Sequence, residues 1–398
     1  MNNGLRKLRV SDLGRVVTGK TPPTAKHHLY GDVYPFITPT DIGEERHCHT
    51  ARAISEDGRN SQKNLLLPAR SICVTCIASI GKTCMTKEPS FTNQQINSVI
   101  VDEERFDPFF VYHLLKSIGS HLKAIASGAA TPILNKTSFS EVEVEVPDLP
   151  TQRKIAGILS AYDDLIENNL RRIRILEEMA QSLYREWFVH FRFPGHESVP
   201  LTDSPLGPIP QGWEVKKMGD IAEDKRRGVP KGNLDEPTPY VGLEHIPRRS
   251  LALDDWEIVS ELGSNKMRFE SGEILFGKIR PYFHKVSVAP FSGVCSADAI
   301  VIRAKSSEDT SLVTACVSSV PFVAHASATA NGAKMPRADW KVLVKYPLVV
   351  PPAELKEKFS SFFSTAVDEQ MNLIRRNQAL RATRDLLLPK LLTGVEQS

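Results

Sequence analysis

The sequence predicts an α+β fold: two similar mixed α/β domains, separated by two long helices that pair as an antiparallel coiled coil, in an internal pseudo-two-fold repeat. An unbroken heptad stripe over Thr151–Phe193 predicts the first long helix. A second copy lies 204 positions further on, because Pro132 recurs as Pro336 and Pro147 as Pro351. The segment order is therefore globule, helix, globule, helix, one unit used twice.

The first long helix is predicted by residues that recur in alternating steps of four and three. The stripe comprises Ile155, Leu159, Tyr162, Ile166, Asn169, Ile173, Leu176, Ala180, Leu183 and Trp187. A stripe of this period packs on a partner helix rather than on a globule. At about 1.5 Å per residue, about 40 residues form a rod of about 60 Å.

The second long helix follows from carrying the stripe forward without a gap. Its positions are Phe359, Phe363, Ala366, Gln370, Leu373, Asn377, Leu380, Arg384, Leu387 and Leu391. This stripe is more polar than the first, and Pro389 is expected to break its last turn. The alternative is that the two stripes belong to unrelated amphipathic helices of one core.

An antiparallel pairing with flush ends places Asn169 opposite Asn377 and Tyr162 opposite Arg384. A buried pair of asparagines fixes the register of a coiled coil at some cost in stability. Leu→Ala at Leu176 or Leu380 is expected to cost about 2–5 kcal/mol each, because a buried leucine leaves a cavity.

The expected domain boundaries follow from proline, glycine and charge. The first globule spans 1–150 and the first helix 151–194, which ends at Pro194-Gly195. A stretch rich in proline and glycine, 195–212, is expected to be an extended linker. The second globule spans 213–350 and the second helix 351–398.

Both globules are expected to be mixed. Short β-like runs occur at 34–42, 71–80, 96–102 and 142–146, and again at 239–246, 272–286 and 298–304. A helix is expected over 106–127, where apolar residues recur at helical spacing. In 142–146 valines alternate with glutamates, which predicts a strand with one buried face.

Composition is ordinary for a soluble protein, with 41% hydrophobic and 24% charged residues and a net charge of +3. A basic surface must therefore come from local patches. Six cysteines are too few for a secreted disulfide framework, and no apolar run approaches the length of a membrane span. The expected location is the cytoplasm.

The sequence contains no complete catalytic motif, so the chain is not expected to be an enzyme by itself. Ser79–Thr83 resembles the end of a phosphate-binding loop, but Cys76 stands where its first glycine belongs. Cys73 and Cys76, near Cys84, raise the possibility of a zinc site, but no second ligand pair completes it. Buried thiols are the better interpretation. No metal site is expected.

Two similar globules held apart by a rod suit a ligand with two separated sites, and duplex DNA is such a ligand. Basic and amide side chains stand at matching places in both globules and can bind phosphates or base edges. The candidate DNA-binding residues are Lys82, Thr83, Gln94, Gln95, Asn97, Lys136, Lys278, Arg280, Tyr282, Lys285, Lys334 and Arg337.

Three motifs carry a resemblance to a known family. They are VPDLPTQRKIAGIL leading into the first helix, SLYREWFVHFRFPG at its end and LLLPKLLTG at the C-terminus. With them the whole chain resembles the specificity subunit of type I restriction–modification systems. The resemblance implies two target-recognition domains that each read one half of a split DNA sequence, and helices that space the halves and dock two modification subunits.

The resemblance also implies that catalysis belongs to partners. Two methyltransferase subunits would carry S-adenosylmethionine, and motor-nuclease restriction subunits would use Mg and ATP, with no cofactor in this chain and no membrane partner. Because the globules differ, an asymmetric target is expected. The second helix lacks a counterpart of Gln152, which leaves its docking open. The alternatives are a coiled-coil scaffold for protein partners and an enzyme with an unrecognised site.

Overall fold

The computed structural model describes residues 4–43, 45–126 and 132–395. The chain divides into two compact units: unit 1 is Met1–Asn168 with Ala379–Ser398, and unit 2 is Asn169–Gln378. Each long helix, α5 (Leu149–Tyr184) and α10 (Ala353–Val395), therefore contributes one part to each unit.

Unit 1 contains a central antiparallel sheet with the strand order β2-β9-β6-β7, a small sheet β3-β5-β4-β8 and the strand pair β1-β10. Its strands are β1 (Arg6–Arg9), β2 (Gly14–Thr18), β3 (Tyr30–Gly31), β4 (Tyr34–Ile37), β5 (Ala53–Ile54), β6 (Ile72–Thr75), β7 (Thr83–Met85), β8 (Phe91–Thr92), β9 (Ile96–Val101) and β10 (Glu143–Val146). Its short helices are α1 (Glu56–Ser61), α2 (Pro108–Ser117), α3 (Gly119–Ile125) and α4 (Lys136–Ser140).

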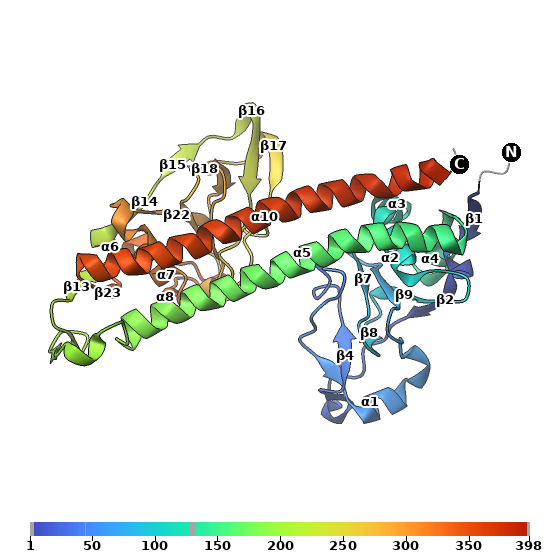
Figure 1. The fold of residues 1–398 in the computed structure, drawn as a ribbon, viewed down its shortest axis with the longest axis horizontal. Coiled ribbons are helices and arrows are strands. Elements are labelled where there is room, and N and C mark those ends of the chain that lie inside the picture. The colour runs from blue at the N-terminus through green and yellow to red at the C-terminus, as the bar shows by residue number, and fades with distance from the viewer. Residues whose placement is uncertain (1–3, 44, 127–131, 396–398) are drawn as a thin grey trace. The chain divides into compact units, whose positions relative to one another are not determined.

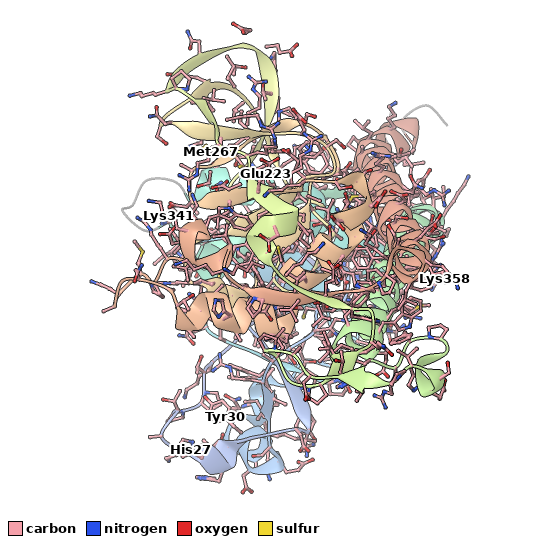
Figure 2. All side chains as sticks on the ribbon, turned by 90° about the vertical axis from the view of Figure 1, so that its left-hand side faces the viewer. His27, Tyr30, Glu223, Met267, Lys341 and Lys358 are labelled. Atoms are coloured by element: carbon pink, nitrogen blue, oxygen red, sulfur yellow. The ribbon has the colours of Figure 1, made fainter. Side chains whose placement is uncertain are left out.

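Unit 2 contains a central sheet β14-β22-β19-β20, a sheet β15-β18-β21-β16-β17 and the pairs β13-β23 and β11-β12. Its strands are β11 (Leu201–Thr202), β12 (Ile209–Pro210), β13 (Glu214–Lys217), β14 (Ala222–Asp224), β15 (Arg227–Val229), β16 (Gly232–Val241), β17 (Glu257–Leu262), β18 (Lys266–Phe269), β19 (Ile274–Gly277), β20 (Val286–Val288), β21 (Gly293–Ser296), β22 (Ala299–Ala304) and β23 (Pro347–Val350). Its short helices are α6 (Met218–Ile221), α7 (Thr310–Val317), α8 (Val320–Ala328) and α9 (Trp340–Leu343). In Figure 2, Tyr30 marks the small sheet of unit 1 and His27 the 3-10 turn just before it, and Glu223 and Met267 mark the two sheets of unit 2.

The predicted internal repeat is confirmed in the central sheets, whereas the second sheet has four strands in unit 1 and five in unit 2. The order β2-β9-β6-β7 in unit 1 recurs as β14-β22-β19-β20 in unit 2. The register recurs as well, since Ile72 pairs with Val99 and Ile274 with Ile302. The helices that flank the central sheet, α2 and α4 in unit 1 and α7 and α9 in unit 2, stand at equivalent places in the repeat. The mixed α/β prediction therefore holds for both units.

The long helices close the core of each unit (Figure 1). In unit 1, Ile155 and Leu159 of α5 and Leu388 of α10 are buried in one apolar cluster with α2 and the central sheet. In unit 2, Ile173 of α5 and Phe359 of α10 belong to the corresponding cluster. Burial of these side chains is the main stabilising contribution to the packing.

The residues of the two heptad stripes are buried to different extents. Those that are buried are Ile155, Leu159, Ile166, Asn169, Ile173, Ala180, Phe359, Phe363, Ala366, Gln370, Leu373, Asn377 and Arg384. Those that are half-buried are Tyr162, Leu176, Leu183, Trp187, Leu380, Leu387 and Leu391.

The helices run antiparallel inside each unit. In unit 2, Asn169 Nδ2 donates to Asn377 Oδ1 at 2.8 Å, as the flush register requires. In unit 1, Arg384 binds Asp163 rather than the preceding Tyr162, with 2.6 Å between Nη1 and Oδ1. A buried guanidinium needs a carboxylate, which the tyrosine cannot supply.

The structure differs from the sequence-based expectation at four elements. The first long helix, expected over 151–194, ends earlier: α5 ends at Tyr184 and a π-helical turn, Arg185–Val189, follows it. The helix expected over 106–127 is two helices, α2 and α3, because the backbone leaves the α-helical region at Ile118, with φ −89° and ψ 7°. Ser127, its expected last residue, lies outside the described residues. The helix α10 continues through Pro389, since Leu388 and the following turn pack on the unit 1 core. The stretch 195–212 contains the hairpin β11-β12.

Gln152 has a structural contact inside unit 1. Its side-chain oxygen accepts from the backbone N–H of Asp107, the N-cap of α2, and its amide donates to the Pro147 carbonyl. In unit 2 the equivalent residue, Lys356, binds Asp309, the N-cap residue of α7, at 2.8 Å. The same tie between the long helix and the domain helix is thus made by a different side chain.

Candidate nucleic-acid interface

The candidate residues of unit 1 gather at one end of the central sheet, where β6 leads into β7. The backbone N–H of Cys76 donates to Gln95, and the Cys76 carbonyl accepts from Leu134. Ile77 forms an isolated bridge with Ile133. These contacts join the β6–β7 loop, the start of β9 and the segment before α4.

The candidate side chains of unit 1 divide into two groups. Lys82, Gln94 and Lys136 are exposed, and Gln95 is half-buried. Thr83 and Asn97 are buried and have partners inside the unit. Thr83 donates to the Gly81 carbonyl at 3.2 Å. Asn97 accepts from Thr18 at 2.7 Å and donates to the Leu134 carbonyl at 3.2 Å, so its polar atoms hold the segment before α4 onto the sheet.

In unit 2 the equivalent loops are joined by the same backbone contacts, but they carry different side chains. The backbone N–H of Lys278 donates to Asp298, and the Lys278 carbonyl accepts from Ala338. Ile279 forms the bridge with Arg337. The residues 278–285 and 331–337, called here the unit 2 loop group, therefore lie together.

Three of the six candidate side chains of the unit 2 loop group are exposed. Tyr282 is 55% exposed. Lys334 and Arg337 are exposed and Lys278 is half-buried. The Arg280 guanidinium lies 5.9 Å from the centre of the Phe283 ring, close enough for a cation–π contact.

Lys285 points inward. Its ammonium group donates to the Leu243 carbonyl. Burial lowers the pKa of Lys285, and the charge of Arg248 adds to the effect. This lysine therefore anchors its loop and has little freedom to meet a phosphate.

The sequence-based list missed a basic pair that the structure adds to the unit 2 loop group. Arg248 forms a bridge with Lys285, and its guanidinium lies 4.1 Å from the centre of the Phe283 ring. The Arg249 N–H donates to the His284 carbonyl at 2.8 Å. Two consecutive arginines were a signal in the sequence, but their distance from the loop along the chain concealed it.

In unit 1 the loop after β2 also lies beside the candidate residues. The Thr21 hydroxyl donates to Gln94 at 2.7 Å, which places this loop beside the exposed amides. Gly19 is required there, because an added Cβ would lie 2.2 Å from the Thr92 hydroxyl oxygen. The neighbouring Lys20 is exposed.

The thiols considered for zinc lie inside unit 1. Cys73, Cys76 and Cys84 are buried, and Cys48 Sγ lies 3.8 Å from Cys84 Sγ. Burial raises the pKa of Cys76 to about 11, which disfavours its thiolate form.

In the described part of the chain, no single helix has both the length and the apolar character needed to cross a membrane. The bent pair Ser307–Val317 and Val320–Ala328 meets these criteria by length and composition only. Its first helix, α7, is buried in the unit 2 core.

Comparison with known proteins agrees with this arrangement. The family model described as type I restriction modification DNA specificity domain matches residues 2–178 and 210–380. The two matches cover most of the chain and correspond to its two repeats. This chain belongs to that family.

Specificity subunits are also the relatives found among curated proteins. The MjaIX type I restriction enzyme specificity subunit of Methanocaldococcus jannaschii is 27% identical over 97% of this chain and 92% of its own length. The HindI type I restriction enzyme specificity subunit of Haemophilus influenzae is 38% identical over 42% of this chain and 38% of its own length.

The fold of the specificity family is also seen in a solved structure. The type I restriction–modification S subunit from M. genitalium matches with a TM-score of 0.55 and 16% identity over 97% of this chain and 96% of that chain. As a specificity subunit of a type I restriction–modification system, the chain is a DNA-recognition component and not the catalytic one.

Proposed function

We propose that each unit reads one half of a split, asymmetric DNA target, and that the long helices set the gap between the halves. The observation that carries the proposal is the repeated loop assembly at the same end of both central sheets. The assembly presents Lys82, Gln94 and Lys136 in unit 1. In unit 2 it presents arginines and an exposed tyrosine. The same backbone arrangement with different side chains in the two units suits two half-sites of different sequence.

The gap follows from the continuity of the long helices. Each of α5 and α10 contributes to both units without a break. The distance between half-sites is then set by a number of helical residues, at about 1.5 Å per residue.

We infer further that each unit docks one modification subunit through the first turns of its long helix. Ile158 of α5 is 37% exposed and Phe362 of α10 is 40% exposed. The two residues are 204 positions apart, the offset of the repeat. Gln152 is fully buried, so its absence from the second copy does not bear on docking. Exposed apolar residues at equivalent positions suit two copies of one partner.

The chemistry then belongs to the partners. Methyltransferase subunits would supply S-adenosylmethionine, and motor-nuclease restriction subunits would use ATP and Mg. Within the described residues no group of three or more histidine, cysteine or carboxylate side chains is arranged to hold a metal ion.

The DNA proposal is tested by selection from a random duplex pool, using the chain assembled with its modification subunit. The expected result is two short conserved blocks of different sequence with a constant unselected gap. Enrichment of no sequence would favour a protein-binding scaffold, and turnover by the isolated chain would favour an unrecognised enzyme.

The docking proposal is tested with Ile158→Asp and Phe362→Asp, each followed by measurement of the mass of the assembled complex. Each substitution is expected to remove one modification subunit of two. Leu201→Asp, on the β11-β12 hairpin, is the control and should leave the mass unchanged, because Leu201 is exposed but lies on neither long helix. Retention of both subunits in each helix variant would contradict the proposal.

A further inference from the structure

A carboxylate, Asp298, lies among the cations of the unit 2 loop group. Its backbone is fixed at the start of β22: the N–H donates to the Ser296 hydroxyl at 3.2 Å, and the carbonyl accepts from Lys278 at 2.8 Å. Its Oδ1 lies 3.5 Å from Nη2 of Arg337.

Arg337 is held as firmly by its own backbone. Its N–H donates to the Asn331 carbonyl at 2.8 Å, and its carbonyl accepts from the Asn331 N–H at 3.0 Å. The bridge to Ile279 fixes the other side. The Arg337 side chain nevertheless remains 54% exposed, so a rigid main chain presents an accessible guanidinium.

The carboxylate of Asp298 argues against a function of this surface in which positive charge alone attracts the DNA backbone. A negative charge beside a phosphate-binding surface weakens attraction to a polyanion. The neighbouring cations are arranged differently, since Arg248 and Arg280 lie against the Phe283 ring. What Asp298 provides is orientation: a guanidinium held on one side by a carboxylate loses less rotamer entropy when its free N–H groups bind a planar pair of acceptors.

We propose that Arg337 reads a guanine in the half-site contacted by unit 2, and that Asp298 is the positioning residue that aims its guanidinium. Guanine presents O6 and N7 as adjacent acceptors in the major groove, the pattern that arginine matches with two parallel hydrogen bonds. The inference rests on the proposed DNA-reading function.

The same place in unit 1 carries neutral residues. Ile133 takes the position of Arg337 in the equivalent bridge, and Gln95 takes that of Asp298 in the equivalent backbone hydrogen bond. Ile133 is exposed. An exposed aliphatic side chain suits a thymine methyl group rather than the acceptors of guanine. The two half-sites are therefore expected to differ at this point.

The test uses the full chain assembled with its modification subunit, the selected target duplex and the set of duplexes with single base-pair changes. Dissociation constants are measured at one fixed salt concentration. Arg337→Ala is expected to reduce discrimination at one G·C pair of the unit 2 half-site by about 5- to 150-fold, the range of one bidentate contact, and to leave other positions unchanged. Arg337→Lys is expected to keep the affinity for random duplex but not the discrimination.

Asp298→Asn distinguishes a positioning role from a purely electrostatic one, because the two roles predict opposite changes in binding. It is expected to reduce discrimination at the same base pair while raising the affinity for random duplex, because a negative charge is removed. Lys334→Ala is the matched control and should weaken binding to all duplexes alike. A uniform loss with Arg337→Ala, or unchanged discrimination with Asp298→Asn, would overturn the inference and leave the proposed function standing. Failure of the unchanged complex to select any sequence would overturn both.

Discussion

Asn169 of α5 and Asn377 of α10 are joined by a 2.8 Å hydrogen bond inside the buried seam of unit 2. The contact is polar in a place where apolar residues would stabilise the helices more. It favours the one register in which the two amides meet, because any shift would bury each amide without its partner.

Asn377→Ala is expected to lower the free energy of unfolding by about 1–3 kcal/mol, because the Asn169 amide would stay buried without this partner. Replacing both asparagines by leucine should recover that loss and allow other registers. Urea unfolding measures the first effect. A loss with the double variant as large as with the single one would contradict this account.

Unit 1 has a buried ion pair at the corresponding level of the helices. Arg384→Ala is expected to cost about 3–5 kcal/mol, because Asp163 would be left as an uncompensated buried charge. The equivalent positions of unit 2 hold Val367 and Ala180. The double change Asp163→Val with Arg384→Ala should therefore restore most of the stability.

The control for this pair is Arg172→Ala, which removes the exposed pair with Glu369 at 2.7 Å. Its expected cost is about 0–1 kcal/mol, because solvent screens an exposed pair. Urea unfolding of all three variants tests the contrast, and equal costs for Arg384→Ala and Arg172→Ala would refute it.

Stability is expected to depend on pH through His113. Burial lowers the pKa of His113 to about 4 and outweighs the attraction of the Asp163 carboxylate, which lies 3.4 Å from Nε2. Between an unfolded pKa of about 6.5 and the folded value, the unfolded chain binds a proton that the folded chain does not. The contribution is therefore complete above about pH 6.5 and declines by about 3 kcal/mol as the pH falls toward 4.

Urea unfolding at a series of pH values measures this decline. His113→Asn should flatten the dependence in that window, whereas His49→Asn, at an exposed histidine, should leave it unchanged. A His113→Asn variant with the original pH dependence would show that another group is responsible.

The leucines of the two heptad stripes are expected to contribute to stability in proportion to their burial. Leu373 is fully buried, so Leu373→Ala should cost about 2–5 kcal/mol through the cavity it leaves. Leu176 and Leu380 are half-buried and should cost less than the range expected from the heptad alone. The order of the three unfolding free energies tests this, and an equal cost at all three positions would argue against it.

The candidate site was only partly predictable. The sequence-based list contained several loop cations of both units, because lysines and arginines beside a predicted turn are visible in one dimension, but it missed Arg248 and Arg249. It also contained Asn97 and Thr83, whose polar groups are used inside unit 1. Hydrogen bonds that satisfy buried groups depend on neighbours brought together by strand pairing, and no local pattern reports them.

The sequence by itself determined the duplication, the two long helices and the pairing of Asn169 with Asn377, because a heptad period and a constant offset are local regularities of the chain. The tertiary structure decided which charges are available at the surface. It turned Lys285 inward and placed Asp298 beside Arg337, residues 39 positions apart. The physical reason is that strand register and loop packing, rather than sequence spacing, determine which polar groups share an environment, and with it their partners and their freedom to bind a ligand.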